Sequence, residues 1–204
     1  SHIVDNSLPS YYRSLNFFKG NINSLYHSNI ENVLSDNHPD VIYISTLADS
    51  HVQIALDIIK RGFEKTIIIE KPLSNSLKNA LELRHKLSKT NWKGKIYLGF
   101  YKRFNEVLKS VKQITKSKKL GNLLNITHYG PIEISRNGSH WIDFANWINS
   151  EERSSIIANL DWEQLSSRRG SGIPDPLCDL ELTYSNKIQL YITPYSHPNY
   201  PNCS

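Results

Sequence analysis

A lysine and a histidine stand at positions suited to proton transfer. Lys71 stands one residue beyond Thr66–Ile69, an apolar run of strand length, where partial burial would lower its pKa. His140 begins a helical pattern that places Asp143 and Trp147 on the same face. Either group could exchange a proton with an alcohol oxygen. The competing interpretations are a surface lysine in a Lys-Pro turn and a packed or helix-capping histidine, and Asp143 could equally be structural.

The first half of the chain alternates between strand patterns and helix patterns. A Ser28–Glu31 capping box predicts a helix start, and Ser50 could cap a helix that ends just before Gly62. Apolar strands separated by helices indicate a parallel sheet covered on both faces. The predicted strands and helices of this half are Ile3-Val4, a possible helix at Ser10–Phe18, a helix to Asp36-Asn37, Val41–Ile44, the Val52–Ile59 helix, Thr66–Ile69, the Ala80–Leu87 helix and Lys95–Phe100.

Beyond about residue 100 the pattern becomes that of an α+β domain. We therefore expect two domains, residues 1–100 and residues 101–204, with a mainly antiparallel sheet in the second. The predicted elements are a helix at Asn105–Lys118, a strand at Leu123–His128, a helix at Ser139–Ile148, strands at Ile156–Leu160, Asp179–Tyr184 and Ile188–Tyr191, a hairpin turn at Ser185–Lys187 and a loop at Ser166–Pro176.

Composition and charge exclude several classes of protein. No apolar run approaches the roughly 18 residues that a membrane-spanning helix needs, and the first residues lack the features of a signal peptide. A cytoplasmic protein is therefore the expectation. Cys178 and Cys203 have no metal-ligand spacing, so we expect reduced thiols and no metal. The net charge is +5, and the basic stretch Lys109–Lys119 lacks interleaved aromatic residues, so we expect no nucleic-acid partner.

Four segments, in order, resemble the Gfo/Idh/MocA family of nicotinamide-dependent oxidoreductases (glucose-fructose oxidoreductase and inositol dehydrogenase are members). They are "DVIYISTLADSHVQIALDIIKRG", "TIIIEKPLSNS", "GFYKRFNEVLKSVK" and "RNGSHWIDFANWI", which together span residues 40 to 150. The resemblance implies a Rossmann-like, doubly wound parallel sheet followed by a smaller α+β domain. It implies catalytic roles for Lys71 and His140, and a Pro72 that is often cis.

The resemblance also assigns a cofactor, NAD or NADP. Asp5 would bond the ribose hydroxyls and slightly favour NAD, although a turn aspartate is the competing interpretation. No Gly-x-Gly-x-x-Gly precedes Asp5, and Gly170-Ser171-Gly172 lacks the strand and helix that such a loop needs, so the chain as given should bind a dinucleotide poorly. The implied cofactor-binding residues are Asp5, Thr46, Leu47, His51, Glu70, Lys71 and Pro72; for His51 helix capping competes evenly.

The substrate implied by the resemblance is a sugar, a sugar acid or a nucleotide-sugar. Arg136 stands where members with a full triad carry an aspartate, which favours an anionic substrate. The candidate substrate-binding residues are Lys102, Arg103, Arg136, Asn137 and Asp143; a salt bridge is the alternative for Lys102 and Arg103. We expect an enzyme of carbohydrate or surface-polysaccharide metabolism that forms a homo-oligomer through the second-domain sheet. The alternative is a non-catalytic, degenerate member that serves as a dimerising binding domain.

Overall fold

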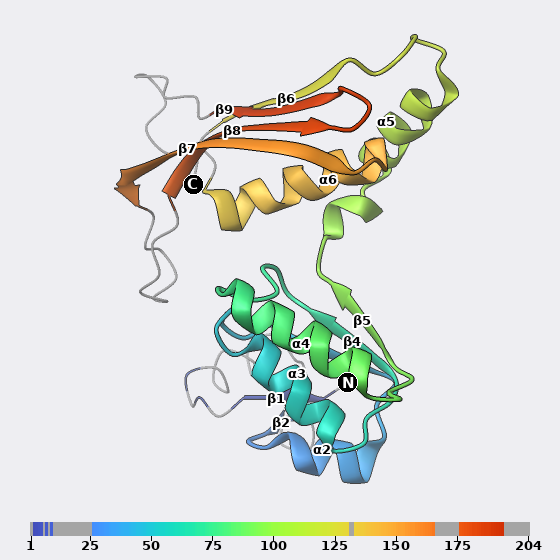
Figure 1. Ribbon diagram of the computed structural model, residues 1–204. Helices are drawn as coiled ribbons and strands as arrows, with labels where there is room; N and C mark the ends of the chain where they lie inside the picture. The colour runs from blue at the N-terminus through green and yellow to red at the C-terminus, as the bar shows by residue number, and fades with distance from the viewer. Residues whose placement is uncertain are drawn as a thin grey trace.

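The computed structural model describes residues 2–5, 7, 9, 26–130, 133–165 and 176–193, and among these only the backbone of Tyr26, Asp36, Asn37, Arg136 and residues 161–165. The described elements gather in two parts, each built around β-strands and helices (Figure 1). The possible helix at Ser10–Phe18, the Gly170–Gly172 segment and Cys203 lie outside the described residues, as does nearly all of the predicted Ser166–Pro176 loop.

Every strand pairing in the first part is parallel, as the alternating pattern predicted. The two-stranded sheet holds β1 (Ile3–Val4) and β2 (Tyr26–His27), and the three-stranded sheet holds, in order, β3 (Val41–Ile44), β4 (Thr66–Ile69) and β5 (Lys95–Leu98). The described helices of this part are α2 (Ile30–Asn37), α3 (His51–Lys60) and α4 (Leu77–Lys89). Strands and helices therefore alternate as an α/β fold requires.

The start of α2 differs from the prediction by one residue. Asn29 is the N-cap, and its side-chain oxygen accepts the backbone N–H of Glu31 at 2.9 Å. The predicted capping box, in which the hydroxyl of Ser28 caps the helix, is therefore wrong. A helix that begins at Ile30 places Asn29 at the cap, where an amide oxygen serves as well as a hydroxyl.

The ends of α3 confirm one prediction and correct another. Ser50 is at the N-cap position but makes no side-chain capping bond, because its hydroxyl donates to the carbonyl of Leu47 at 2.8 Å. Gly62, just beyond the helix, has a φ of +85°, which is the left-handed conformation that favours glycine.

One face of the three-stranded sheet packs against the helices. Ile67 and Ile69 are fully buried at its centre, with further side chains from α3 and α4 around them (Val52, Ala55, Ile58 and Leu83). The other face carries Tyr43 and Tyr97, each 52% exposed. Among the described helices, α2, α3 and α4 all contribute to the hydrophobic cluster on the first face.

The second part is a four-stranded sheet with helices. Its strand order is β6-β9-β8-β7, with β6 parallel to β9 and the other two pairings antiparallel, as predicted for a mainly antiparallel sheet. The elements are the 3-10 helix η2 (Tyr101–Phe104), α5 (Glu106–Ser117), β6 (Asn125–Tyr129), the π-helix η3 (Ile134–Gly138), α6 (Ser139–Asn149), β7 (Arg153–Leu165), β8 (Pro176–Tyr184) and β9 (Gln189–Thr193).

The inner face of this sheet makes a second hydrophobic cluster. Leu182, Leu190 and Ile192 are almost fully buried there, together with Ala145 of α6. Cys178 of β8 belongs to the same cluster as a buried free thiol, and burial raises its pKa. The predicted hairpin between β8 and β9 is confirmed, with its turn at residues 185–187.

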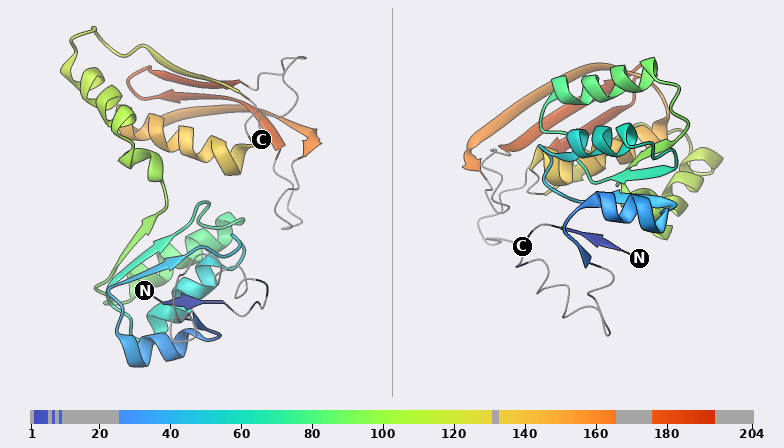
Figure 2. Two further views of the ribbon diagram at one scale, coloured as in Figure 1. Left: turned by 180° about the vertical axis from the view of Figure 1, so that it is seen from behind. Right: turned by 90° about the horizontal axis from the view of Figure 1, so that it is seen from below.

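The chain passes from the first part to the second where β5 leads into η2 (Figure 1, Figure 2). Figure 1 shows that β5 points toward the second part, so the carboxyl ends of the parallel strands β3 and β4 face it as well. Residues that follow these strands are thereby placed near α6. Among the described helices, none combines the length and the apolar character that crossing a bilayer requires.

Candidate active site

The loops after β3, β4 and β5 meet at one edge of the sheet. Parallel strands end on the same side, and ligands of open α/β sheets bind there. Thr46 and Leu47 follow β3, Glu70 and Lys71 follow β4, and Gly99 follows β5. The sequence predicted this gathering of the cofactor-edge residues correctly, since it follows from the order of the strands.

Glu70 is held by two hydrogen bonds at this edge. One of its carboxylate oxygens accepts the hydroxyl of Tyr43, and the other accepts the backbone N–H of Lys71 at 3.1 Å. The pKa of Tyr43 is raised to about 12. Partial burial is the largest cause, and the hydrogen bond to the Glu70 carboxylate is the next. A Cβ at Gly99 would lie 3.3 Å from the Glu70 carboxylate oxygen, so the loop after β5 also passes close to this side chain.

Lys71, the second residue after β4, is half-buried. The Lys71–Pro72 peptide bond is cis, as the family resemblance implied. The backbone N–H of Lys71 is fixed by Glu70, so the start of this loop has a defined orientation. The Lys71 side chain thus leaves the sheet at the edge that faces α6.

His51, the first residue of α3, is 1% exposed. Its Nδ1 lies 2.9 Å from the carbonyl oxygen of Pro72, and its Nε2 lies 3.0 Å from the carbonyl oxygen of Thr46. The side chain therefore spans the loop after β3 and the loop after β4. Its predicted contact with a cofactor stays a prediction.

His140 lies on α6 and is 1% exposed. Aromatic rings cover it at the junction between β5 and η2, with the ring centroid of Tyr101 at 4.7 Å and that of Phe100 at 5.9 Å. Within the part of the chain that the structure describes, His140 Nδ1 has no hydrogen-bond partner. A buried nitrogen without a partner costs about 1–3 kcal/mol, so a bound hydroxyl group would be a favourable partner for this ring.

The environment of His140 keeps its imidazole neutral. Burial is the largest cause that lowers its pKa to about 4. The positive charges of Lys71 and Lys102 act in the same direction, whereas the charges of Glu70 and Asp143 oppose the shift. Lys71 comes from the first part and His140 from the second, and the charge of Lys71 acts on the pKa of His140 across the two parts.

Arg103 and Asp143, both predicted to hold substrate, bind each other. The guanidinium donates two hydrogen bonds to the buried carboxylate, from Nε to Oδ2 at 2.8 Å and from Nη2 to Oδ1 at 2.5 Å. The bond to Asp143 raises the pKa of Arg103. This bidentate pair fixes α6 against η2. The salt bridge that competed with substrate binding for Arg103 is therefore present, and a substrate contact stays a prediction.

Lys102 lies among aromatic rings next to His140. Its Nζ is 4.5 Å from the ring centroid of Trp141 and 5.9 Å from that of Tyr101, within cation–π range. His128 of β6 stacks on Trp141 at 4.4 Å, and burial followed by the charge of Lys102 lowers the pKa of His128. This Lys102–Trp141–His128 group lies beside the histidine and carries a positive charge.

Asp5 immediately follows β1, as the resemblance requires of an acid that bonds a ribose. Its Oδ1 accepts the backbone N–H of Ser7 at 2.8 Å, and its own N–H donates to the carbonyl of His27 at 3.0 Å. A bond from an aspartate to the backbone N–H two residues later is typical of a turn, which is the competing interpretation of Asp5. The carboxylate stands at the end of a parallel strand, and its cofactor role stays a prediction.

The remaining candidates lie near α6 and the β3 loop. Thr46 and Leu47 are exposed, and the hydroxyl of Thr46 lies 2.7 Å from that of Ser50. Asn137 is exposed in η3, one turn before His140. Arg136 precedes it, but its side chain lies outside the described atoms, so its predicted substrate contact stays a prediction.

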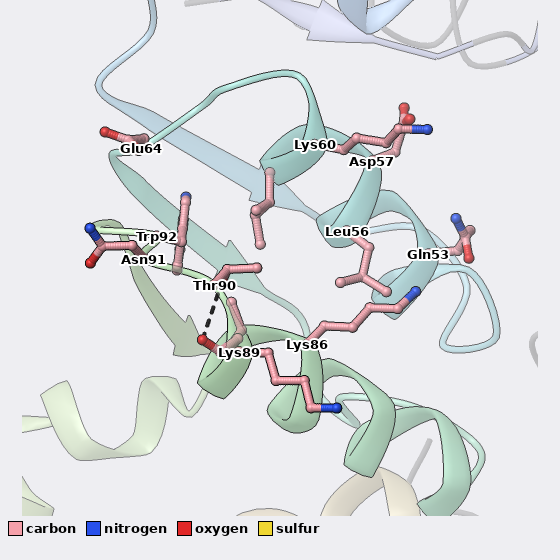
Figure 3. Close-up of a pocket in the computed structure, with 12 residues that line it drawn as sticks. Gln53, Leu56, Asp57, Lys60, Glu64, Lys86, Lys89, Thr90, Asn91 and Trp92 are labelled. Atoms are coloured by element: carbon pink, nitrogen blue, oxygen red, sulfur yellow. Dashed lines mark hydrogen bonds between the residues drawn. The ribbon is translucent and has the colours of Figure 1, made fainter.

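A cavity of about 770 Å³ lies elsewhere, between α3 and α4 (Figure 3). Its lining comes from α3, from the carboxyl end of α4 and from the segment that follows α4 up to Trp92, and it includes none of the predicted site residues. Since both helices run opposite to the strands, their carboxyl ends lie at the amino edge of the sheet. The cavity is therefore remote from the carboxyl edge that presents Lys71.

Sequence reasoning missed the aromatic surroundings of His140. Tyr101 and Trp141 are each adjacent in the sequence to a predicted site residue. The position of Tyr101 immediately before Lys102 and Arg103 was the one signal that could have indicated an aromatic surface at the site. His128 lay in a predicted strand, but only the strand pairing brings it under α6. Tyr43 was assigned to a buried strand, and its bond to Glu70 depends on the register between β3 and β4.

Residues 9–96 match the model of an oxidoreductase family with an NAD-binding Rossmann fold, GFO_IDH_MocA. Residues 9–96 are the part of the chain that is similar to this family. The predicted resemblance to the family and the predicted fold class are thereby confirmed. None of the curated proteins compared with the chain matches it.

Solved structures show the same fold over nearly the whole chain. One is myo-inositol dehydrogenase from Lactobacillus casei in complex with NAD(H) and myo-inositol, with 21% identity, a TM-score of 0.68, and 95% of this chain and 59% of that chain covered. Another is the WlbA dehydrogenase from Chromobacterium violaceum in complex with NADH and UDP-GlcNAcA, with 14% identity, a TM-score of 0.71, and coverage of 97% and 60%. The chain thus spans about three fifths of the length of these structures.

Proposed function

We propose that the protein is an NAD(P)-dependent oxidoreductase that acts on a hydroxyl group of a sugar, a sugar acid or a nucleotide-sugar. The buried Nδ1 of His140, which has no hydrogen-bond partner among the described residues, is the observation that carries this proposal. The positive charge of Lys71, which follows a strand of the Rossmann fold, lowers the pKa of the same ring and supports a site that both residues share. The family supports the cofactor class, and the two neighbours with bound NAD(H) support it as well.

The dinucleotide would lie along the carboxyl edge of the parallel strands. Asp5 would bond the ribose hydroxyls, which slightly favours NAD because a carboxylate would repel the 2′-phosphate of NADP. Thr46, Leu47 and Glu70–Pro72 would surround the nicotinamide end. These loops already meet at one edge, and the helix α6, which carries His140, belongs to the second part that this edge faces (Figure 1). When bound, the cofactor supplies the acceptor or donor of a hydride.

Lys71 and His140 would share the hydroxyl proton of the substrate. The neutral imidazole of His140 can accept this proton, and the ammonium group of Lys71 can stabilise the oxygen that loses it. A pKa near 4 makes His140 a weak base in the free protein. An anionic substrate beside Lys71 and Lys102 would offset their charges and raise the pKa of His140 toward neutrality. Binding would therefore strengthen the base.

An acidic or phosphorylated sugar suits the surroundings of the histidine. Lys102 lies beside the rings of Tyr101 and Trp141, where an apolar sugar face could also stack. Arg136 and Asn137 in η3 would contact the polar groups of such a substrate. Arg103 and Asp143 would act through their bidentate pair, which orients the helix that carries His140.

The outer face of the second sheet would form the contact between subunits. Ile157 and Tyr129 are 60% and 70% exposed, and the strand register places both on the side opposite the buried core. In this arrangement residues 1–100 would form the cofactor domain, and residues 101–204 the substrate and oligomerisation domain. Analytical ultracentrifugation of Ile157→Lys tests the contact: the variant should sediment as a smaller species, and an unchanged species would contradict it.

Fluorescence titration with NADH and with NADPH tests the function, on a protein that carries these 204 residues together with any sequence that precedes them in the gene. Initial rates would then be measured with a neutral polyol, a sugar acid and a nucleotide-sugar. Lys71→Ala and His140→Ala should each lower kcat by about 10²-fold or more. Lys78→Ala, an exposed lysine on α4, is the matched control and should leave kcat unchanged.

Absence of nucleotide binding would contradict the oxidoreductase proposal. A protein that still self-associates in that case would support the non-catalytic alternative, a dimerising domain. If the protein binds the nucleotide but Lys71→Ala leaves the rates unchanged, the proposed cofactor stands and the proposed role of Lys71 in proton transfer is contradicted.

A further inference from the structure

We propose that His51 is a positioning residue that ties the loop after β3 to the loop after β4. In this role it holds Thr46 and the Lys71 loop in one fixed arrangement instead of contacting the cofactor itself. The structural part of this inference is independent of the proposed function, whereas its effect on turnover rests on that function.

The contacts of the imidazole ring carry the inference. Nδ1 lies 2.9 Å from the carbonyl oxygen of Pro72, and Nε2 lies 3.0 Å from the carbonyl oxygen of Thr46. The ring is 1% exposed, so solvent does not compete for either nitrogen. The two carbonyls belong to loops that follow the adjacent parallel strands β3 and β4. The ring adds a side-chain bridge at the place where the pairing of these strands ends.

Both loops carry predicted cofactor or catalytic residues. Pro72 directly follows Lys71, so a contact to the Pro72 carbonyl restrains the backbone that presents the Lys71 side chain. Thr46 is restrained a second time, because its hydroxyl lies 2.7 Å from that of Ser50, which donates to the carbonyl of Leu47. The β3 loop thus has two restraints, and the contacts of the β4 loop include those to His51 and to the Glu70 side chain.

Helix capping does not explain this side chain. His51 is the first residue of α3, not the residue before it, and its ring nitrogens face carbonyl groups of other segments instead of the free N–H groups of its own helix. A carbonyl oxygen only accepts, so each contact needs an N–H of the ring. A ring with one N–H donates to one of the two carbonyls, and a ring with two N–H groups donates to both. Because each ring nitrogen faces a different carbonyl, two variants can separate the two contacts.

Hydrogen exchange followed by mass spectrometry tests the bridge without reference to activity. In His51→Leu, peptides covering residues 70–76 and residues 45–50 should exchange at least several-fold faster than in the wild type, while β4 and the centre of α3 should stay protected. His85→Leu, which replaces an exposed histidine of α4, is the control and should match the wild type. Unchanged exchange in the two loops would overturn the proposal. So would a uniform increase across the first part, because that result indicates a general packing role.

Kinetics of two conservative variants test the positioning role. The amide nitrogen of Asn replaces Nδ1, so His51→Asn keeps the Pro72 contact; that of Gln replaces Nε2, so His51→Gln keeps the Thr46 contact. His51→Gln should lower kcat by roughly tenfold or more with little change in the Kd of NADH, since a small misplacement of a catalytic group is costly. His51→Asn should instead weaken NADH binding more than it lowers kcat.

An equal loss of kcat and NADH affinity in both variants would overturn the positioning role. If the protein proves inactive with every substrate, the proposed function fails, and the exchange experiment still decides whether His51 bridges the two loops.

Discussion

Acidification should destabilise the folded protein through His140. In the fold, burial followed by the charges of Lys71 and Lys102 lowers the pKa of this imidazole from 6.5 to about 4. In the unfolded chain these influences are absent, so the unfolded chain binds a proton at a pH where the folded protein does not. Stability conferred by the neutral ring is complete above pH 6.5 and is lost as the pH falls toward 4.

The size of this loss follows from the two pKa values. A tenfold change in proton affinity corresponds to about 1.4 kcal/mol, so by pH 4.5 the free energy of unfolding should have dropped by about 2–3 kcal/mol because of this one group. His128, whose pKa is also lowered by burial, adds to the decline with the same sign. This is a large share of the roughly 5–15 kcal/mol that stabilises an ordinary domain.

Urea denaturation at several pH values between 7.5 and 4.5 provides the assay. The unfolding free energy of the wild type should fall with decreasing pH more steeply than that of His140→Gln, which cannot titrate in this range. The difference between the two slopes isolates His140 from all other groups. His85→Gln removes an exposed histidine and should show the wild-type slope. Parallel curves for the wild type and His140→Gln would refute the reasoning, because they would mean that the buried ring carries no lowered pKa.

Further predictions concern individual contacts. Tyr43→Phe removes the hydroxyl that Glu70 accepts and should cost about 1 kcal/mol in urea denaturation; an unchanged midpoint would mean that the bond contributes nothing. Arg103→Lys cannot reproduce the bidentate bond to the buried Asp143 and should lower Tm, whereas Lys109→Arg on exposed α5 should not. Gly62→Ala places a side chain at a φ of +85°, where no atom lies within 4 Å of the new Cβ, so the cost of about 1 kcal/mol should be purely conformational. A Gly62→Ala protein as stable as the wild type would show that this turn rearranges.

The parts of the fold that follow from local pattern were predictable from the sequence. Alternating apolar segments gave the parallel order of β3, β4 and β5, and the edge where Lys71 emerges follows from that order alone. The β8–β9 hairpin was equally local, since four residues, 185–188, separate its strands. By contrast, the cap of α2 was misplaced by one residue, because Ser28 and Asn29 are both good capping residues and only the helix start decides between them.

The parts of the site that depend on distant contacts were not predictable. Arg103 and Asp143 are 40 positions apart, and nothing in either segment indicates that they pair. The pKa of His140 depends on burial beneath Tyr101 and on the charge of Lys71, which comes from a different part of the fold. The bridge made by His51 is of the same kind: its histidine was visible in the sequence, but its two carbonyl partners belong to backbone groups, which no side-chain pattern reveals.

The central claim is that Lys71 and His140 act on the same hydroxyl group. A double-mutant cycle of Lys71→Ala and His140→Ala, read by single-turnover hydride transfer, tests this most directly. If the residues serve one proton-transfer step, the double variant should be about as slow as the slower single variant, because the second substitution removes little that remains. Rate losses that multiply in full would show that the two side chains act independently and would contradict the shared site.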